Sequence, residues 1–322
     1  GAKVLETFTA EQPNSPYYIP AMLDMGLIYL NLGDRERSLR CYDKVITADP
    51  QSKASKDAMQ SVREIDVAKG DVASYFAYAE RAGVECDLSL MTRDSLSFRS
   101  AQNIYLADRT TDAISHLKSY LENYPKGYYT NDALFCLSDC YLKSDSLDRA
   151  VESLKLLAEQ PQNQYTVPVV EKLARVTYDN KMYDEAAPAF RRMYDVVDNA
   201  VARTEAANGY AESVLLRNND DALMAMANDL DSLADVDAVM LRQVRFAKAK
   251  VHSGRGEAAE ARKIYEMLAA DVSNVEGAES AYRVVEALFA EGKLDECEQK
   301  IYALADSRID DIGDAVCVYV PF

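Results

Sequence analysis

The sequence has no tryptophan, only two histidines, and little glycine or proline. Among its 322 residues are 12 glycines and 9 prolines. Sheet proteins need many tight turns, which glycine and proline usually supply, so this scarcity favours long helices. His116 and His252 are the only histidines. Two histidines are too few for a histidine-rich metal site, and they limit the possible histidine-based catalytic sites.

The chain is strongly acidic. It carries 36 basic and 53 acidic residues, which gives a net charge of −17. Such a chain repels phosphate backbones, so nucleic-acid binding is disfavoured. No run of 18 apolar residues is present, and we expect no membrane insertion within this chain. Apolar residues make up 48% of the sequence, as in a folded globular protein, and the six cysteines are too dilute for a disulfide scaffold.

Two segments, residues 21–50 and 133–161, follow one plan. Each has an apolar helix of period 3.6, a short polar turn, and a second amphipathic helix that ends near proline. Counted from Ile19 as position 1, the marker residues of the first segment are Met22 at 4, Met25 at 7, Gly26 at 8, Tyr29 at 11, Ser38 at 20, Tyr42 at 24 and Pro50 at 32. In these residues the sequence resembles the tetratricopeptide repeat family, and the resemblance covers nearly the whole chain.

The same frame recurs along the sequence, with repeats starting near 19, 56, 94, 131, 167, 203, 242 and 278. A small residue at position 20 lets the second helix (helix B) approach the first (helix A), and an apolar residue at position 24 is expected to be buried. Position 20 is occupied by Ser38, Tyr75, Ala113, Ala150, Ala186, Ala222, Ala261 and Cys297. Position 24 is occupied by Tyr42, Ala79, Leu117, Leu154, Phe190, Met226, Tyr265 and Ile301. The frame of the sixth repeat can slip by one residue.

The predicted fold is all-α. The resemblance implies a right-handed superhelical solenoid of about eight helix-turn-helix repeats over residues 19–310, in which each hairpin buries its apolar face against its neighbours. Residues 1–18 are expected to hold a partial repeat, with helix B alone at residues 2–12, and a linker. Residues 311–322 are expected to form an incomplete segment, and the whole is expected to be a piece of a longer array.

A second resemblance concerns residues 12–26 and 124–141. Both segments run from a proline through a turn and tyrosines to a helix led by alanine. This layout is similar to bacterial cell-envelope repeat proteins such as the outer-membrane assembly lipoprotein and the Tol-Pal coordinator. The resemblance implies a periplasmic or cell-envelope location, and any signal peptide would lie upstream of these residues. A cytoplasmic location is the alternative.

Three features could suggest chemistry. The pattern G-x-G-x-x-A at Gly254–Ala259 lacks the preceding strand that a dinucleotide site needs, so we interpret it as a turn. Cys136 and Cys140 share a helical face near His116, but a structural zinc site needs a fourth ligand, and packing is the favoured interpretation. Residues 195–237 hold ten acids and two arginines, and we interpret them as a solvated acidic face, with docking of a basic partner as the alternative. We therefore predict no enzymatic activity, no cofactor and no metal.

The family resemblance implies that positions 5, 9 and 12 of helix A line a concave surface. Taken from the third, fourth, fifth, seventh and eighth repeats, the residues at these positions are Phe98, Gln102, Tyr105, Phe135, Asp139, Leu142, Glu171, Arg175, Tyr178, Phe246, Lys250, Tyr282, Glu286 and Phe289. Aromatic rings with charges between them suit capture of a peptide or helix from a partner protein. The alternative for each ring is packing between adjacent A helices. The predicted function is an interaction scaffold, and the alternative is a structural rod segment of a larger or self-associating envelope assembly. The oligomeric state stays open.

Overall fold

The computed structural model describes residues 1–305, and the regular elements of that part are seventeen α-helices without a strand. Their bounds are α1 Ala2–Glu11, α2 Tyr18–Asn31, α3 Arg35–Ala48, α4 Lys53–Lys69, α5 Val72–Ala82, α6 Leu90–Leu106, α7 Thr110–Asn123, α8 Thr130–Lys143, α9 Leu147–Ala158, α10 Thr166–Asp179, α11 Tyr183–Val196, α12 Ala200–Leu216, α13 Asp220–Ser232, α14 Ala238–Gly254, α15 Ala258–Leu268, α16 Val275–Ala290 and α17 Leu294–Ala305. After α1, the helices pair into eight hairpins, from α2 with α3 to α16 with α17. The prediction of an all-α helical repeat fold is confirmed.

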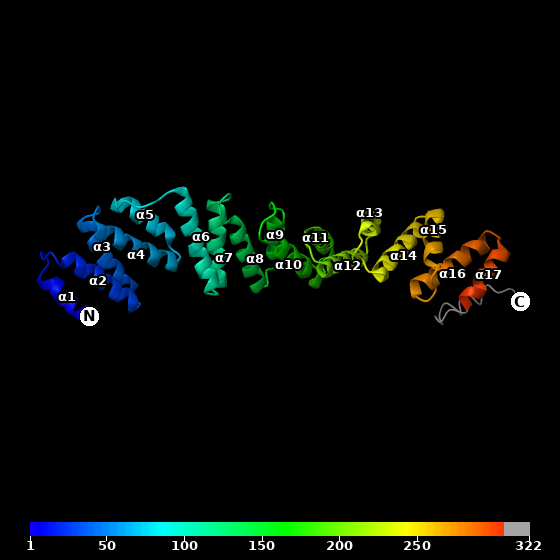
Figure 1. The fold of residues 1–322 in the computed structure, drawn as a ribbon, viewed down its shortest axis with the longest axis horizontal. Coiled ribbons are helices and arrows are strands. Elements are labelled where there is room, and N and C mark those ends of the chain that lie inside the picture. Colours follow the sequence, from blue (N-terminus) through cyan, green and yellow to red (C-terminus); the bar gives the residue numbers. More distant parts are fainter. Residues whose placement is uncertain (306–322) are drawn as a thin grey trace. The chain divides into compact units, whose positions relative to one another are not determined.

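Residue contacts divide the chain into two compact units, Gly1–Tyr165 (unit 1) and Thr166–Phe322 (unit 2). Unit 1 contains α1–α9, and the described part of unit 2 contains α10–α17 (Figure 1). Within unit 1, α2, α3 and α4 lie side by side, as do α6, α7 and α8. The boundary falls between the fourth and fifth hairpins, where the repeat spacing gives no sign of it. The expectation for residues 311–322 lies outside the described residues.

Each hairpin turns through one residue with a positive φ angle. The eight residues are Gly33, Gly70, Asp108, Asp145, Lys181, Asn218, Gly256 and Gly292. Glycine adopts this left-handed conformation without cost, and aspartate and asparagine tolerate it better than most other residues. Half of the hairpins therefore turn without glycine, which explains how so many turns coexist with so few glycines.

The fourth and eighth residues of every B helix are buried. The fourth residues are Ser38, Tyr75, Ala113, Ala150, Ala186, Leu223, Ala261 and Cys297, and the eighth are Tyr42, Ala79, Leu117, Leu154, Phe190, Ala227, Tyr265 and Ile301. In the first hairpin, a Cβ atom at Gly26 would lie 2.5 Å from Cε1 of the Tyr42 ring, so glycine lets this ring cross the A helix. Helix–helix contact at these positions is what the sequence spacing predicts.

One part of this frame is wrong. The sequence places Ala222 and Met226 at the buried positions of the sixth repeat, but Leu223 and Ala227 are buried there, and the predicted pair is only partly buried. The physical reason is the residue at which α13 begins, because that residue sets which side chains face the A helix. Asn219 caps α13 by accepting a hydrogen bond from the backbone N–H of Ala222 at 3.0 Å, and the helix phase is counted from that cap.

Candidate functional site on the A helices

The A helices are α2, α4, α6 and α8 in unit 1 and α10, α12, α14 and α16 in unit 2. We call the side chains at positions 5, 9 and 12 of these helices the A-helix face. Phe98 does not belong to its surface. Only 4% of Phe98 is exposed, its ring stacks on Tyr129 with centroids 4.8 Å apart, and Tyr120 lies 5.6 Å away. Phe98 as a partner-binding residue is therefore wrong, because a tyrosine from the next repeat covers it.

The same arrangement recurs one repeat later. The rings of Phe135 and Tyr165 lie 5.1 Å apart, and the Tyr165 hydroxyl donates a hydrogen bond to Asp132 at 2.6 Å. Tyr129 and Tyr165 each directly precede an A helix. Phe135 remains partly exposed. In the third and fourth repeats, the phenylalanine at position 5 thus packs against the tyrosine that directly precedes the next A helix.

A buried carboxylate organises the segment between α7 and α8. Asp94 accepts hydrogen bonds from the Tyr120 hydroxyl at 2.5 Å and from the backbone N–H of Tyr128 at 2.7 Å. A Cβ atom at Gly127 would lie 2.6 Å from the Tyr120 hydroxyl oxygen, so only glycine fits this turn. Burial, with the hydrogen bond to Asp94, raises the pKa of Tyr120. Asp94 was not singled out from sequence, because its importance depends on residues of the following repeat.

The structure brings Tyr105 and Asp139 together from α6 and α8. The Tyr105 hydroxyl donates to Asp139 at 3.0 Å, and Lys143 lies 5.5 Å from the centre of the Tyr105 ring. Lys143 also pairs with Asp108 at 2.9 Å and with Asp139 at 3.7 Å. Burial, strengthened by the Asp139 hydrogen bond, raises the pKa of Tyr105 to about 12. These predicted site residues therefore tie two successive A helices together while staying partly exposed.

In unit 2 the A-helix face carries a similar tie. Exposed Arg175 on α10 pairs with Glu205 on α12 at 2.9 Å. Three residues further on, the Tyr178 ring lies 5.9 Å from each of the Tyr183 and Phe190 rings. Burial raises the pKa of Tyr178 to about 12, and its hydrogen bond to Glu212 adds to the rise. The exposed guanidinium of Arg175 thus shares a helix with the partly exposed ring of Tyr178, which is packed against two other rings.

The other predicted residues stay at or near the surface. Phe246 is partly exposed, with the Tyr265 ring 6.1 Å away and the Lys250 ammonium 5.6 Å from its ring centre. Phe289 and Lys250 are exposed. The partly exposed residues of the set are Gln102, Leu142, Glu171, Tyr282 and Glu286. All predicted residues except Phe98 therefore remain accessible in their own unit.

The acidic stretch of unit 2 is largely ion-paired. Arg191 on α11 pairs with Asp195 at 2.5 Å and with Asp229 at 2.7 Å. Further pairs join Arg203 to Asp235, Arg245 to Asp231 and Arg255 to Asp221. Several of these arginines lie outside residues 195–237, so a count within the stretch misses them. The interpretation as a simple solvated face needs this correction, because the acids tie α13 and its following loop to α11, α12 and α14.

The cysteine pair and the glycine motif occupy positions that serve packing and chain turning. Cys136 and Cys140 are buried in the core, and burial raises the pKa of their thiols to about 12 and about 11. Gly254 ends α14, and Gly256 lies in the turn that leads to α15, so the interpretation of this segment as a turn is confirmed. Across residues 1–305, no group of three or more histidine, cysteine or acidic side chains is placed to hold a metal ion. Helices long and apolar enough to cross a bilayer are likewise absent from that range.

The geometry defines the class of protein as a helical repeat protein. Residues 19–52, which are the first hairpin with its flanks, match the family model of the tetratricopeptide repeat. No curated protein sequence matches the chain. Similar solved structures include a tetratricopeptide repeat protein from Parabacteroides merdae, at 12% identity over 94% of this chain and 98% of that chain, with a TM-score of 0.31. The tetratricopeptide domain of P58(IPK) matches at 16% identity over 99% and 93% of the two chains, with a TM-score of 0.28.

Proposed function

We propose that this protein is a non-enzymatic scaffold that binds a peptide or helix of a partner protein on the A-helix face. Helical repeat arrays present extended surfaces of this kind, and tetratricopeptide repeats generally mediate protein–protein interaction. The supporting observation is the combination of Arg175 and Tyr178 on one face of α10. A supported aromatic ring beside an exposed charge offers contact area with little loss of side-chain freedom.

The charges of the A-helix face are held in place before any partner arrives. Arg175 is paired with Glu205, and the Tyr105 hydroxyl is bonded to Asp139. A partner that meets fixed charges does not have to order them, so less of its binding energy is lost. Within each unit, aromatic rings supply apolar area beside these pairs. This favours an amphipathic segment, whose apolar side meets the rings and whose polar side meets the pairs.

Site-specific photo-crosslinking tests the proposal. A photoreactive amino acid is placed at Arg175 on the A-helix face, and in a matched variant at Met267, an exposed residue of the B helix α15. Each variant is expressed as the full-length protein in its own cells and irradiated. We expect a crosslinked partner from position 175, a much lower yield from position 267, and a loss of the product when Tyr178→Ala is added. Equal yields from the two positions would contradict the proposal.

A structural role in a larger envelope assembly is the second candidate. Exposed apolar side chains at helix ends, such as Leu32, Leu90 and Leu106, are the observation in its favour. Light scattering across a wide concentration range decides it, because a chain that stays monomeric throughout is not self-associating. We also propose a periplasmic or cell-envelope location, supported by the proline–tyrosine layout of residues 12–26 and 124–141. Recovery of the full-length protein in the cytoplasmic fraction would refute this location.

A further inference from the structure

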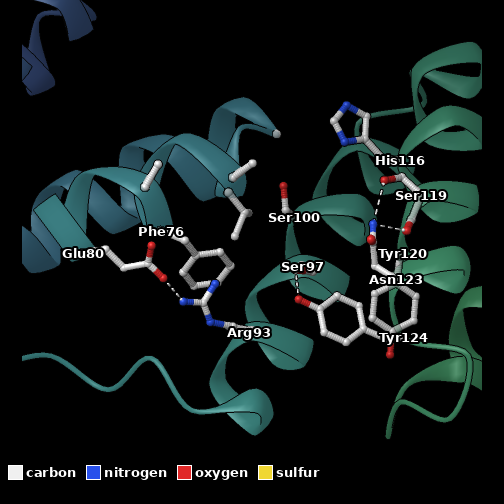
Figure 2. A pocket seen from close by; sticks show the side chains of 14 residues that line it. Phe76, Glu80, Arg93, Ser97, Ser100, His116, Ser119, Tyr120, Asn123 and Tyr124 are labelled. Carbon is white, nitrogen blue, oxygen red and sulfur yellow. Dashed lines mark hydrogen bonds and ion pairs between the residues drawn. The ribbon is translucent and has the colours of Figure 1, made fainter.

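The second and third hairpins of unit 1 meet mainly through their A helices, α4 and α6. In unit 1, α3 packs along α4 and α7 packs along α8, whereas α5 touches α6 at only a few points. Residues 83–89 connect α5 to α6 without helix or strand. A pocket of about 560 Å³ lies in the resulting space between α5, α6 and α7 (Figure 2). This volume is within the range of ligand-binding pockets.

The two sides of the pocket differ in polarity. The α5 side is mainly apolar and is formed by Val72, Ala73, Phe76 and Ala77. The α6 and α7 side is polar and is formed by Ser97, Ser100, His116, Ser119, Asn123 and Tyr124. At one end Arg93 lies over the Phe76 ring at 4.7 Å and forms an ion pair with Glu80. Because these two charges cancel, the pocket favours an uncharged ligand with hydrogen-bonding groups.

Ser100 is the residue that points most directly to a ligand. It is only 2% exposed, and its hydroxyl has no hydrogen-bond partner in the described part of the chain. Figure 2 shows this hydroxyl directed into the space between the two sides. Buried hydroxyl groups nearly always have a partner, since leaving one unpaired costs stability. A partner that enters the pocket would satisfy it.

The neighbouring polar groups are positioned around the same space. The His116 ring packs against the turn at Gly70, where a Cβ atom would lie 3.1 Å from its Cε1 atom. Gly70 has a φ of +92°, a left-handed conformation that favours glycine, and a Cβ atom there would also lie 2.8 Å from Cδ1 of Ile104. The Asn123 amide donates to the backbone oxygen of Ser119 at 2.8 Å, which fixes its orientation. Imidazole, hydroxyl and carboxamide groups can each donate or accept a hydrogen bond.

We propose that this pocket binds a short, uncharged, extended peptide segment of a partner protein through its main chain. An extended main chain offers N–H donors and C=O acceptors, which the serines, His116 and Asn123 can pair. A small apolar side chain of the segment then lies against Phe76 and its neighbours. None of the predicted A-helix face residues lines this pocket. It is a second site that does not depend on the proposed function.

The probe is a phage-displayed library of random uncharged octapeptides, selected on the whole chain. The recovered peptides are titrated against the native protein and against Ser100→Ala, with Ser115→Ala as the control, because Ser115 is exposed on the same helix as His116 and lies outside the pocket. Loss of one hydrogen bond should weaken binding about fivefold in Ser100→Ala. The same substitution should raise the thermal midpoint of the free protein, because it removes an unpaired hydroxyl. Ser115→Ala and Tyr178→Ala should leave the affinity unchanged.

The two histidines give an independent readout. In a ¹³C–¹H spectrum of the ring Cε1–H groups, a bound peptide should shift the His116 signal and leave the His252 signal in place, with His116→Phe assigning the pair. Peptides that lose affinity in Tyr178→Ala but not in Ser100→Ala would overturn the pocket while supporting the A-helix face. A library that yields no peptide dependent on Ser100 would overturn it as well.

Discussion

Asp66 should make the stability of unit 1 depend on pH. It lies on α4 with 8% of its surface exposed, between the buried side chains of Ile65 and Val67. Burial raises the pKa of this carboxyl from its usual value of 3.8 to about 6, repulsion from Asp71 adds to the rise, and Lys69 opposes it. The substitution Asp66→Asn removes the charge and keeps the size and shape of the side chain.

The magnitude follows from the shift in the pKa of Asp66. A rise from 3.8 to about 6 corresponds to about 3 kcal/mol between the two protonation states. The folded protein holds this proton more tightly than the unfolded chain does. Ionising the buried Asp66 carboxyl therefore lowers the free energy of unfolding. This loss of stability is absent below about pH 4, grows as the pH rises from 4 to 6, and is complete above about pH 6. At pH 7, Asp66→Asn should be more stable than the native protein by about 1–3 kcal/mol, because the buried amide keeps part of the desolvation cost.

Urea unfolding followed by far-ultraviolet circular dichroism at pH 4, 5, 6 and 7 measures this difference. Because hairpins of a repeat array need not unfold together, hydrogen exchange of the α4 and α5 amides should accompany it. Asp57→Asn is the matched control, since Asp57 is exposed on the same helix. The advantage of Asp66→Asn should vanish near pH 4 and be complete at pH 7. An advantage of equal size at every pH, or none at pH 7, would refute the reasoning.

Three further predictions concern packing and charge. Phe98→Ala should lower the free energy of unfolding in urea by about 3–5 kcal/mol, because it empties a buried aromatic site. A loss below about 1 kcal/mol would contradict the burial of Phe98. Gly26→Ala should lower the thermal midpoint, since its methyl group would meet the Tyr42 ring, and adding Tyr42→Leu should restore part of the loss. Arg191→Met should cost about 1 kcal/mol at low salt and less at 1 M salt, and an effect independent of salt would argue against the ion pairs with Asp195 and Asp229.

Much of the fold could be predicted because its signals are local. The buried fourth and eighth residues of the B helices recur at a fixed distance, and each hairpin can be recognised from its own residues. The sixth repeat fails by one position because the cap at Asn219, and not the distance to the previous repeat, sets the phase of α13. A period read from the sequence carries no information about such a cap unless the capping residue is recognised separately.

The site was harder to predict because it depends on contacts between repeats. Phe98 and Phe135 occupy the same position, yet Phe98 is buried and Phe135 is partly exposed. Phe98 has a stacked Tyr129 ring and a second ring, Tyr120, against it, whereas Phe135 has the tilted ring of Tyr165. The Ser100 pocket depends on three helices that meet at the junction of two hairpins, and no spacing in the sequence marks it. The arginine partners of the acidic stretch lie one or two helices away in the chain.

The packing of Phe98 against Tyr129 and of Phe135 against Tyr165 has a consequence for the design of fragments of this protein. Each phenylalanine belongs to one hairpin, while the ring that covers it comes after that hairpin has ended. A fragment that stops at the last helical residue of a hairpin, such as Asn123, would remove the tyrosine that covers its phenylalanine and so expose apolar surface that favours aggregation. A fragment that continues to the tyrosine would keep the ring that covers its phenylalanine. Residues 1–165 end on such a tyrosine and are therefore the natural fragment to express.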